Sequence, residues 1–320
     1  MKRLRRAVLA GLVMALLAVC QRAYTPVAAA RAGEPHPSPI PSRGAATQLD
    51  VASWNIEWFG APSNGPTDER LQLAHARDVI RGTDADIWGL VEVVDGAAWD
   101  RLGAGLPGYT GVLANDRIVA GGAASYGRKE QKVGVLFKSG VATLVRARVI
   151  LAGDDIAFAG RPPLEVTLRV TLNGVTEDLV VIVLHMKAFA DRASWQRRRT
   201  AAGLLQHYLD TTWPTQKVIV IGDWNDDVDT SITRGSPTPF ASLVAAPHRY
   251  RFLTAPLSER RIASTTGYRE LIDHHLATDE LASSEVPRSA EVYRVDAFIP
   301  AYSTTTSDHF PVLTHFTMQR

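Results

Sequence analysis

Residues 178–187 read DLVVIVLHMK, and residues 217–227 read KVIVIGDWNDD. In both stretches a run of Val, Ile and Leu leads directly into a short polar group. Continuous apolar runs of this length are typical of strands that are buried on both faces. Between them, apolar residues recur at helical spacing from Trp195 to Leu209, which predicts a helix over 192–209. This order of elements favours a layered α/β domain.

The rest of the chain continues this alternation. Further strands are expected at 49–55, 85–94, 133–137, 164–170, 270–277 and 310–316, and a second helix at 67–81. We find no repeat with a period of 20–50 residues, which argues against a repeat architecture. No linker-like segment interrupts the alternation, so we expect residues 48–320 to form one catalytic domain.

The N-terminal residues have the composition of an export signal. Residues 1–30 begin with a basic segment, continue with an apolar run at 7–19 and end with three alanines. This run is shorter than the roughly 20 residues that a membrane-spanning helix needs. An uncleaved anchor and a lipoprotein attached at Cys20 are the alternatives. Residues 31–47, rich in proline and glycine, are expected to form a flexible linker.

Composition and charge exclude several classes of protein. A hydrophobic share of 46% and a charged share of 21% are typical of a globular domain, not of a disordered chain or a polytopic membrane protein. One cysteine cannot form an intramolecular disulfide framework. Residues 1–30 hold five of the 35 Lys and Arg and none of the 33 Asp and Glu, so the remainder carries a net charge of −3. A phosphate substrate would therefore need a metal ion or a local basic patch.

Polar groups stand next to five of the expected strands. They are Trp54-Asn55-Ile56-Glu57, Val91-Glu92-Val93, His185-Met186-Lys187, Gly222–Asp227 and Ser307-Asp308-His309. Because functional sites usually lie at the ends of core strands, we expect these groups to converge on one edge of a sheet.

The side chains in these groups suit one kind of chemistry. Oxygen ligands suited to Mg²⁺ or Mn²⁺ come from Asn55, Glu92 and Asp308. His185 and His309 can exchange protons near neutral pH. Asp223 can orient a water, and Asn225 can hold a phosphate oxygen without adding negative charge. The set predicts metal-assisted hydrolysis of a phosphate ester.

These motifs together resemble the endonuclease/exonuclease/phosphatase superfamily, whose fold is that of the deoxyribonuclease-I-like enzymes. The most specific strings are Gly222-Asp223-Trp224-Asn225 and Ser307-Asp308-His309-Phe310-Pro311-Val312, with Ile272-Asp273-His274 between them. The resemblance spans about 49–317. It implies a four-layer α/β sandwich of two packed mixed β-sheets flanked by helices, and a bacterial secreted member of the superfamily.

The resemblance also implies a metal centre and its water. By this comparison Glu92 is the main metal ligand, and Asn55 and Asp308 complete or support the site. Asp223 would position the attacking water. Asn225 would contact the scissile phosphate.

The same resemblance implies roles for the two histidines. His309, oriented by Asp273, would be the general base or would stabilise the transition state. His185 would contact the phosphate or assist the leaving group. Glu130, or its neighbour Gln131, resembles the residue that orients this second histidine.

The function expected from the sequence is a secreted or periplasmic, metal-dependent nuclease that acts on DNA as a monomer. The resemblance implies that Arg161 would bind a backbone phosphate. Lys187 would contact phosphate too, or else stay solvated at the mouth of its loop. A sphingomyelinase or inositol-phosphate phosphatase with the same core is one alternative, and a non-catalytic binding module is another. The run Arg197-Arg198-Arg199 is expected on a solvated helix face, whereas Trp54 and Trp88 are expected in the core.

Overall fold

The computed structural model describes residues 38–318. The expected leader at 1–30 and the first part of the expected linker lie outside these residues. Within 38–318, no helix is both long enough and apolar enough to cross a membrane.

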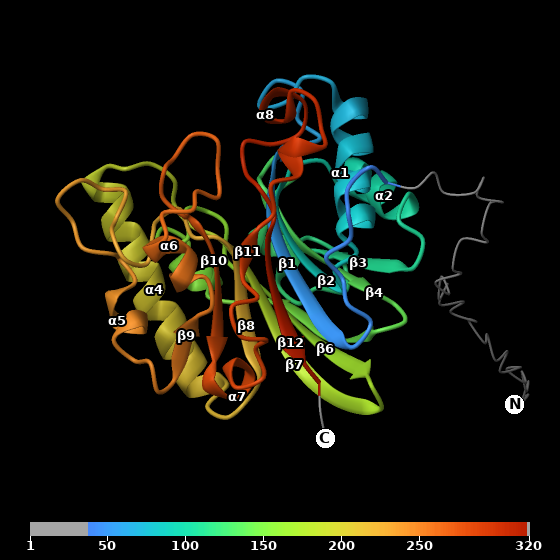
Figure 1. Cartoon of the computed structure of the whole chain (residues 1–320). Coiled ribbons are helices and arrows are strands. Elements are labelled where there is room, and N and C mark those ends of the chain that lie inside the picture. The colour runs from blue at the N-terminus through green and yellow to red at the C-terminus, as the bar shows by residue number, and fades with distance from the viewer. Residues whose placement is uncertain (1–37, 319–320) are drawn as a thin grey trace, which may run out of the picture. The chain divides into compact units, whose positions relative to one another are not determined.

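Two mixed six-stranded sheets form the centre of the domain (Figure 1). The first has the order β11-β12-β1-β2-β4-β3, and the second has the order β5-β6-β7-β8-β10-β9. The first comprises β1 (Gln48–Phe59), β2 (Ile87–Val93), β3 (Tyr109–Leu113), β4 (Lys132–Lys138), β11 (Glu291–Val292) and β12 (Val312–Thr317). The second comprises β5 (Ala142–Val149), β6 (Leu164–Leu172), β7 (Val175–His185), β8 (Val218–Asp223), β9 (Tyr250–Phe252) and β10 (Asp273–Thr278).

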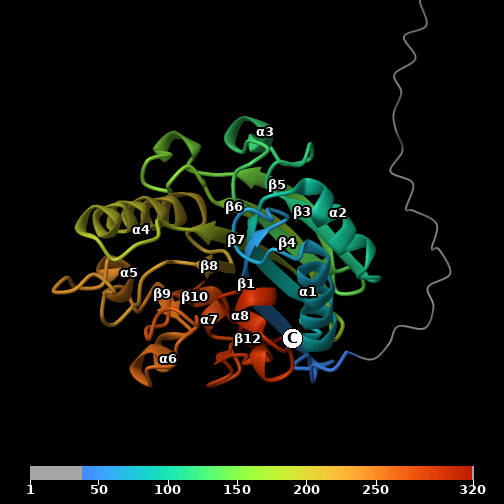
Figure 2. The same ribbon diagram turned by 90° about the horizontal axis from the view of Figure 1, so that it is seen from above.

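Helices cover the outer faces of both sheets, so that α1 and α2 lie on one side of the domain and α4 on the other (Figures 1 and 2). The helices are α1 (Glu69–Thr83), α2 (Gly96–Ala104), α3 (Gly122–Ser125), α4 (Arg192–Thr212), α5 (Ala241–Val244), α6 (Ala255–Glu259), α7 (Asp279–Ala282) and α8 (Tyr302–Thr305). This arrangement confirms the predicted four-layer α/β sandwich.

Alternation along β7 explains why that strand is apolar at every position from Leu179 to Leu184. Val181 and Val183 pack between the sheets, whereas Ile182 and Leu184 pack against the α4 side. The sheets approach closely. A Cβ on Gly89 of β2 would lie 2.7 Å from the Cδ1 of Ile221 in β8, so this position has no room for a side chain.

The segment just before β1 differs from the flexible linker expected there. Ile40 is buried among the residues that pack against α1. Arg43 donates to Glu291 at 2.8 Å, and the Gly44 N–H donates to the Thr83 carbonyl at 3.1 Å. An apolar anchor and backbone hydrogen bonds therefore fix residues 38–47 to the domain despite their proline content.

Candidate active site

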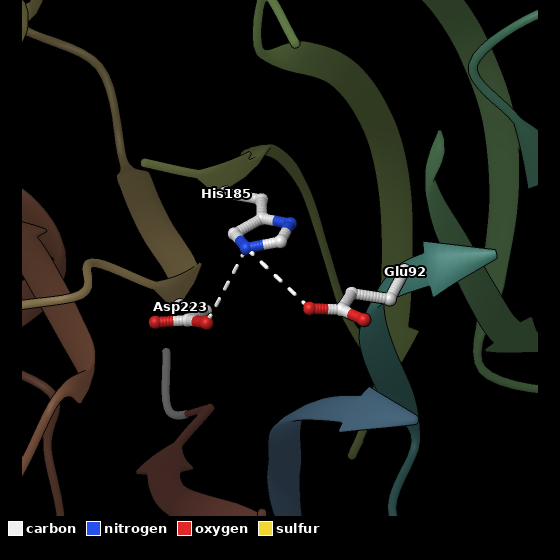
Figure 3. A group of neighbouring side chains, drawn as sticks. All are labelled: Glu92, His185 and Asp223. Atoms are coloured by element: carbon white, nitrogen blue, oxygen red, sulfur yellow. Dashed lines mark ion pairs between the residues drawn. The ribbon is translucent and has the colours of Figure 1, made fainter. Parts of the chain in front are cut away.

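Strand register brings the site together. The parallel pairing of β7 and β8 sets His185 beside Asp223, and the antiparallel pairing of β8 and β10 sets Asp223 beside Asp273. Glu92 reaches the same place from the end of β2 in the other sheet. Figure 3 shows the side chains of Glu92, His185 and Asp223 converging on one point from three strands. This confirms the expected meeting of polar groups at the strand ends.

The first cluster surrounds the imidazole of His185. Its Nε2 lies 3.7 Å from Glu92 Oε1 and 3.5 Å from Asp223 Oδ2. The Asn55 amide N–H donates to the same two carboxylates at 3.0 and 3.1 Å. Its oxygen is already engaged, because it accepts the Glu57 backbone N–H at 3.0 Å. Asn55 therefore orients the carboxylates here, which is the supporting one of the two roles expected for it, to complete or to support the metal site.

The second cluster joins His309 to two buried carboxylates. His309 Nδ1 and Asp273 Oδ2 are 2.8 Å apart, and His309 Nε2 is 3.8 Å from Asp223 Oδ2. The Ser264 hydroxyl donates to Asp273 Oδ2 at 2.6 Å. Although burial opposes it, attraction to Asp273 and Asp223 raises the pKa of His309 well above its ordinary value. The structure thus forms the predicted Asp273–His309 pair and favours its imidazolium form.

The two histidines have opposite electrostatic environments. Burial, helped by repulsion from Arg161, lowers the pKa of His185 well below its ordinary value, so this imidazole stays neutral. Burial also raises the pKa of Asp223 to about 7, while the charge of His309 pulls it down. The site therefore holds one cationic and one neutral imidazole on either side of a shared carboxyl group.

Glu57 is a further carboxylate of this edge, beside Glu92, Asp223 and Asp273, and no role is expected for it from the sequence. Burial and repulsion from Asp308 raise its pKa to about 7. Its Oε2 is buried and has no hydrogen-bond partner within residues 38–318. The available signal was its position two residues after Asn55, next to the same strand end.

The donors present fit a divalent cation. Ligand atoms of Glu92, His185 and Asp223 lie within 4.8 Å of one another, as do those of Asp223, Asp273 and His309. Glu57 and Asp308 add carboxylates whose mutual repulsion a cation would relieve. Hard oxygen donors of this kind suit Mg²⁺ or Mn²⁺.

Backbone strain concentrates at the same edge. Glu57, Trp58, Glu92 and Asn225 all adopt positive φ angles, between 47° and 66°. The pairing of β1 with β2 shifts register between Asn55 and Phe59, next to these residues. Bulges and left-handed residues re-aim side chains and are common at functional sites.

The predicted phosphate contacts lie on the side of β7. Asn225 is buried, and its amide donates to the Met186 carbonyl at 3.1 Å. Arg161 donates to the same carbonyl at 2.8 Å, while its Nε has no partner within the described residues. Lys187 Nζ lies 4.2 Å from the ring centre of Phe189, which is exposed and has a φ of 81°.

The structure does not bring Glu130 to His185. Glu130 is exposed, and its carboxylate accepts the Gly127 N–H. His185 Nδ1 has no hydrogen-bond partner among residues 38–318. The alternative, Gln131, instead accepts from Arg161 at 2.5 Å. Neither residue orients His185, because Glu130 is exposed and Gln131 is engaged with Arg161.

Arg198 is buried, which corrects the expectation that the run Arg197-Arg198-Arg199 lies on a solvated helix face. Its side chain is fully buried in α4 and pairs with Asp226 at 2.8 Å. It also donates to the carbonyls of Lys187 and Phe189, at 2.6 and 2.9 Å. The guanidinium thus ties the loop after His185 to the loop after Asp223.

Comparison with known proteins assigns the chain to a family. Residues 52–309 match the Endonuclease/Exonuclease/phosphatase family, and the chain belongs to it. This confirms the resemblance inferred from the motifs. Members of the family are hydrolytic phosphoesterases that generally use divalent metals. No curated protein matches the chain.

Solved structures share the fold at low sequence identity. Zebrafish TDP2, in complex with a single-strand DNA product, is 13% identical with a TM-score of 0.62, over 85% of this chain and all of that one. The human Nocturnin catalytic domain with bound sulfate is 17% identical with a TM-score of 0.57, over 86% of this chain and 96% of that one. A mannosyl-6-phosphatase of Bacteroides thetaiotaomicron is 16% identical with a TM-score of 0.54, over 84% of this chain and all of that one.

Proposed function

We propose that this protein is a metal-dependent phosphodiesterase that cleaves DNA. The observation that carries the proposal is the pair of clusters that share Asp223, one with Glu92 and His185, the other with Asp273 and His309. Such a set can activate a nucleophile on one side of a phosphorus atom and stabilise charge on the other.

The chain's own residues would divide the work as follows. Asp223 would accept a hydrogen bond from the attacking water and hold it in line. His309, kept cationic by Asp273, would stabilise the negative charge that develops on the phosphoryl oxygens. Neutral His185 and the Asn225 amide would contact the phosphate without adding negative charge.

A bound Mg²⁺ or Mn²⁺ would supply Lewis-acid polarisation of a phosphoryl oxygen. Glu92 and Asp308 would hold it, with Glu57 as a further carboxylate, and Asn55 would fix the Glu92 carboxylate through its amide.

DNA is the substrate we favour because fixed positive charge lies beside the catalytic groups. Arg161 feels the charges of Glu92 and Asp223, and Lys187 follows His185 by two residues. These cations supply locally what the net charge does not. The N-terminal leader would deliver the enzyme to the periplasm or the medium, where it would act as a monomer.

The test is hydrolysis by the purified protein of plasmid DNA, RNA, sphingomyelin vesicles and inositol phosphates. Each substrate is assayed with Mg²⁺, with Mn²⁺ and with excess chelator. We expect DNA cleavage that chelator abolishes, and Glu92→Gln should lose activity while the protein stays folded by circular dichroism. Preference for sphingomyelin or an inositol phosphate, or full activity in chelator, would contradict the proposal.

A further inference from the structure

A groove of about 800 Å³ lies beside the catalytic edge, outside the clusters described above. One wall is formed by residues 260–266, which follow α6. The opposite wall is formed by β11 and the residues around it, and Phe310 also lines the groove. Its volume falls in the range of about 300–1,000 Å³ that is typical of ligand sites and exceeds what one phosphate needs.

The groove is joined directly to the segment that carries the catalytic histidine. Thr265 pairs with His309 in an antiparallel bridge. The Thr266 N–H donates to the Asp308 carbonyl at 2.8 Å, and the Phe310 N–H donates to the Ser264 carbonyl at 2.8 Å. A molecule that fills the groove therefore borders the chain segment of Asp308 and His309.

The acidic residues of the groove are already neutralised. Asp296 accepts two hydrogen bonds from Arg294, at 2.9 and 2.7 Å. Glu291 accepts one from Arg43 at 2.8 Å. Neither acid therefore leaves an uncompensated negative charge in the groove.

Arg260 and Arg261 leave an excess of positive charge. Both are exposed and line the groove. Within residues 38–318, neither guanidinium has a hydrogen bond or an ion pair. Arg261 has a φ of 56°, a conformation that side-chain-bearing residues rarely adopt. Two free guanidinium groups side by side favour an anionic ligand, since each can hold a phosphate by two hydrogen bonds.

The other lining residues favour a ligand that is long and partly apolar. Leu257, Ile262 and Val292 line the same groove as the two arginines. A polynucleotide strand presents phosphates at regular spacing, with sugars and bases between them. Arginines would then contact phosphates, and the apolar side chains would contact sugars and bases.

We propose that this groove binds the backbone of a single DNA strand flanking the scissile phosphate, with Arg260 and Arg261 as its phosphate contacts. The proposal rests on the proposed nuclease function and adds to it a requirement for more than one phosphate. A substrate with a single phosphodiester would not reach the groove.

The experiment compares wild type with Arg260→Ala/Arg261→Ala on two substrates, a single-stranded DNA oligonucleotide and bis(p-nitrophenyl) phosphate. On the oligonucleotide we expect KM to rise on the order of tenfold with little change in kcat. The slope of log kcat/KM against log salt should flatten by about 1.4, roughly 0.7 for each lost phosphate contact. On the one-phosphate ester, kcat/KM should stay within about twofold, which also shows that the variant is folded.

A matched control removes the same charge elsewhere. Arg169 lies in β6 and pairs with Asp178, seven residues before His185. Lys217 directly precedes β8, pairs with Glu177 and stands six residues before Asp223. At about 3.3 Å per strand residue, both positions are roughly 20 Å from the site. Arg169→Ala/Lys217→Ala should leave KM and the salt slope almost unchanged. Arg260→Lys/Arg261→Lys should retain most binding, because the charge stays in the groove.

Each other outcome has a definite meaning. Unchanged KM and salt slope in the arginine variant, with wild type cleaving DNA, would overturn the groove while the nuclease function stands. An equal rise in KM and an equal flattening of the salt slope in the Arg169→Ala/Lys217→Ala control would show that net charge, and not the groove, determines DNA binding. Binding to phosphatidylserine vesicles is measured for the same proteins. If the Arg260→Ala/Arg261→Ala variant loses vesicle binding but cleaves the oligonucleotide like wild type, the groove binds a lipid surface instead of DNA. A wild type that does not cleave DNA would overturn both proposals.

Discussion

Replacing Asp273 by asparagine tests whether His309 works as one unit with its carboxylate. The substitution keeps the shape of the side chain but removes the charge 2.8 Å from His309 Nδ1. Two unit charges about 4 Å apart in a protein site attract by about 4 kcal/mol at an effective dielectric constant of 20. At 1.36 kcal/mol for each tenfold, the loss of this attraction lowers the imidazolium fraction of His309, and with it kcat, by up to about three orders of magnitude above the new pKa.

The assay is steady-state hydrolysis of a phosphodiester by wild type, Asp273→Asn, His309→Ala and the double variant. Residues that act as one unit show strongly non-additive effects, so the double variant should be little worse than His309→Ala alone. Near-ultraviolet circular dichroism and the melting temperature of each variant control for misfolding. Losses that multiply independently, or a His309→Ala variant within about threefold of wild type, would refute the pairing and favour His185 as the key histidine.

The pH profile separates two roles for His309. Asp273 raises the pKa of His309, so its removal lowers that pKa. If the imidazolium stabilises the transition state, the alkaline limb of the kcat profile should lie at lower pH in Asp273→Asn than in wild type. If neutral His309 is a base, the acidic limb should move to lower pH instead, and activity at low pH would rise relative to the optimum.

Three other predictions test separate features. Glu57→Gln should raise the free energy of unfolding of the metal-free protein at pH 8 by ~1–2 kcal/mol, a value discounted for the partial exposure of Glu57. The reason is that the raised pKa of Glu57 makes wild type lose stability as the pH rises from about 4.5 to 7. Urea unfolding should show no difference between the two proteins at pH 4. Arg198→Met should cost ~3–5 kcal/mol by leaving Asp226 buried and unpaired, and Arg198→Met/Asp226→Asn should recover part of that loss in the same measurement. N-terminal sequencing of exported protein should begin near Arg31, whereas full-length cytosolic protein alone would refute the leader.

The buried strands and the site were predictable because each rests on a local pattern. In β7 the apolar run reflects packing on both faces, and it ends at His185, whose side chain points into the site. The motif strings then placed Asp223, Asp273 and His309 correctly at one edge. Strands β3, β5, β9 and β11 were missed. β5, for example, carries arginines at two of its eight positions, so its sequence lacks the apolar signal of a core strand.

Side-chain roles that depend on distant partners were not predictable. For Asn55 the sequence leaves open whether it completes the metal site or supports it, and only the structure shows its amide facing two carboxylates and its oxygen accepting a backbone N–H. Arg198 looks like one of three surface arginines, and only the pairing with Asp226, in the loop after β8, makes its burial favourable. Glu130 was assigned by resemblance, which cannot foresee that its side chain is exposed and accepts the Gly127 N–H.

The placement of Asp223 shows how catalysis here depends on core packing. One of its oxygens lies near the Asn55 amide, His185 Nε2 and His309 Nε2, and the other accepts the Asn225 N–H at 2.9 Å. These contacts come from both sheets and require β7 and β8 to keep their register. A slip of one residue would separate His185 from Asp223 and would also turn the alternating side chains of β7 to the wrong layers. The apolar residues that fix this register therefore determine the geometry of the site as much as the polar residues that form it.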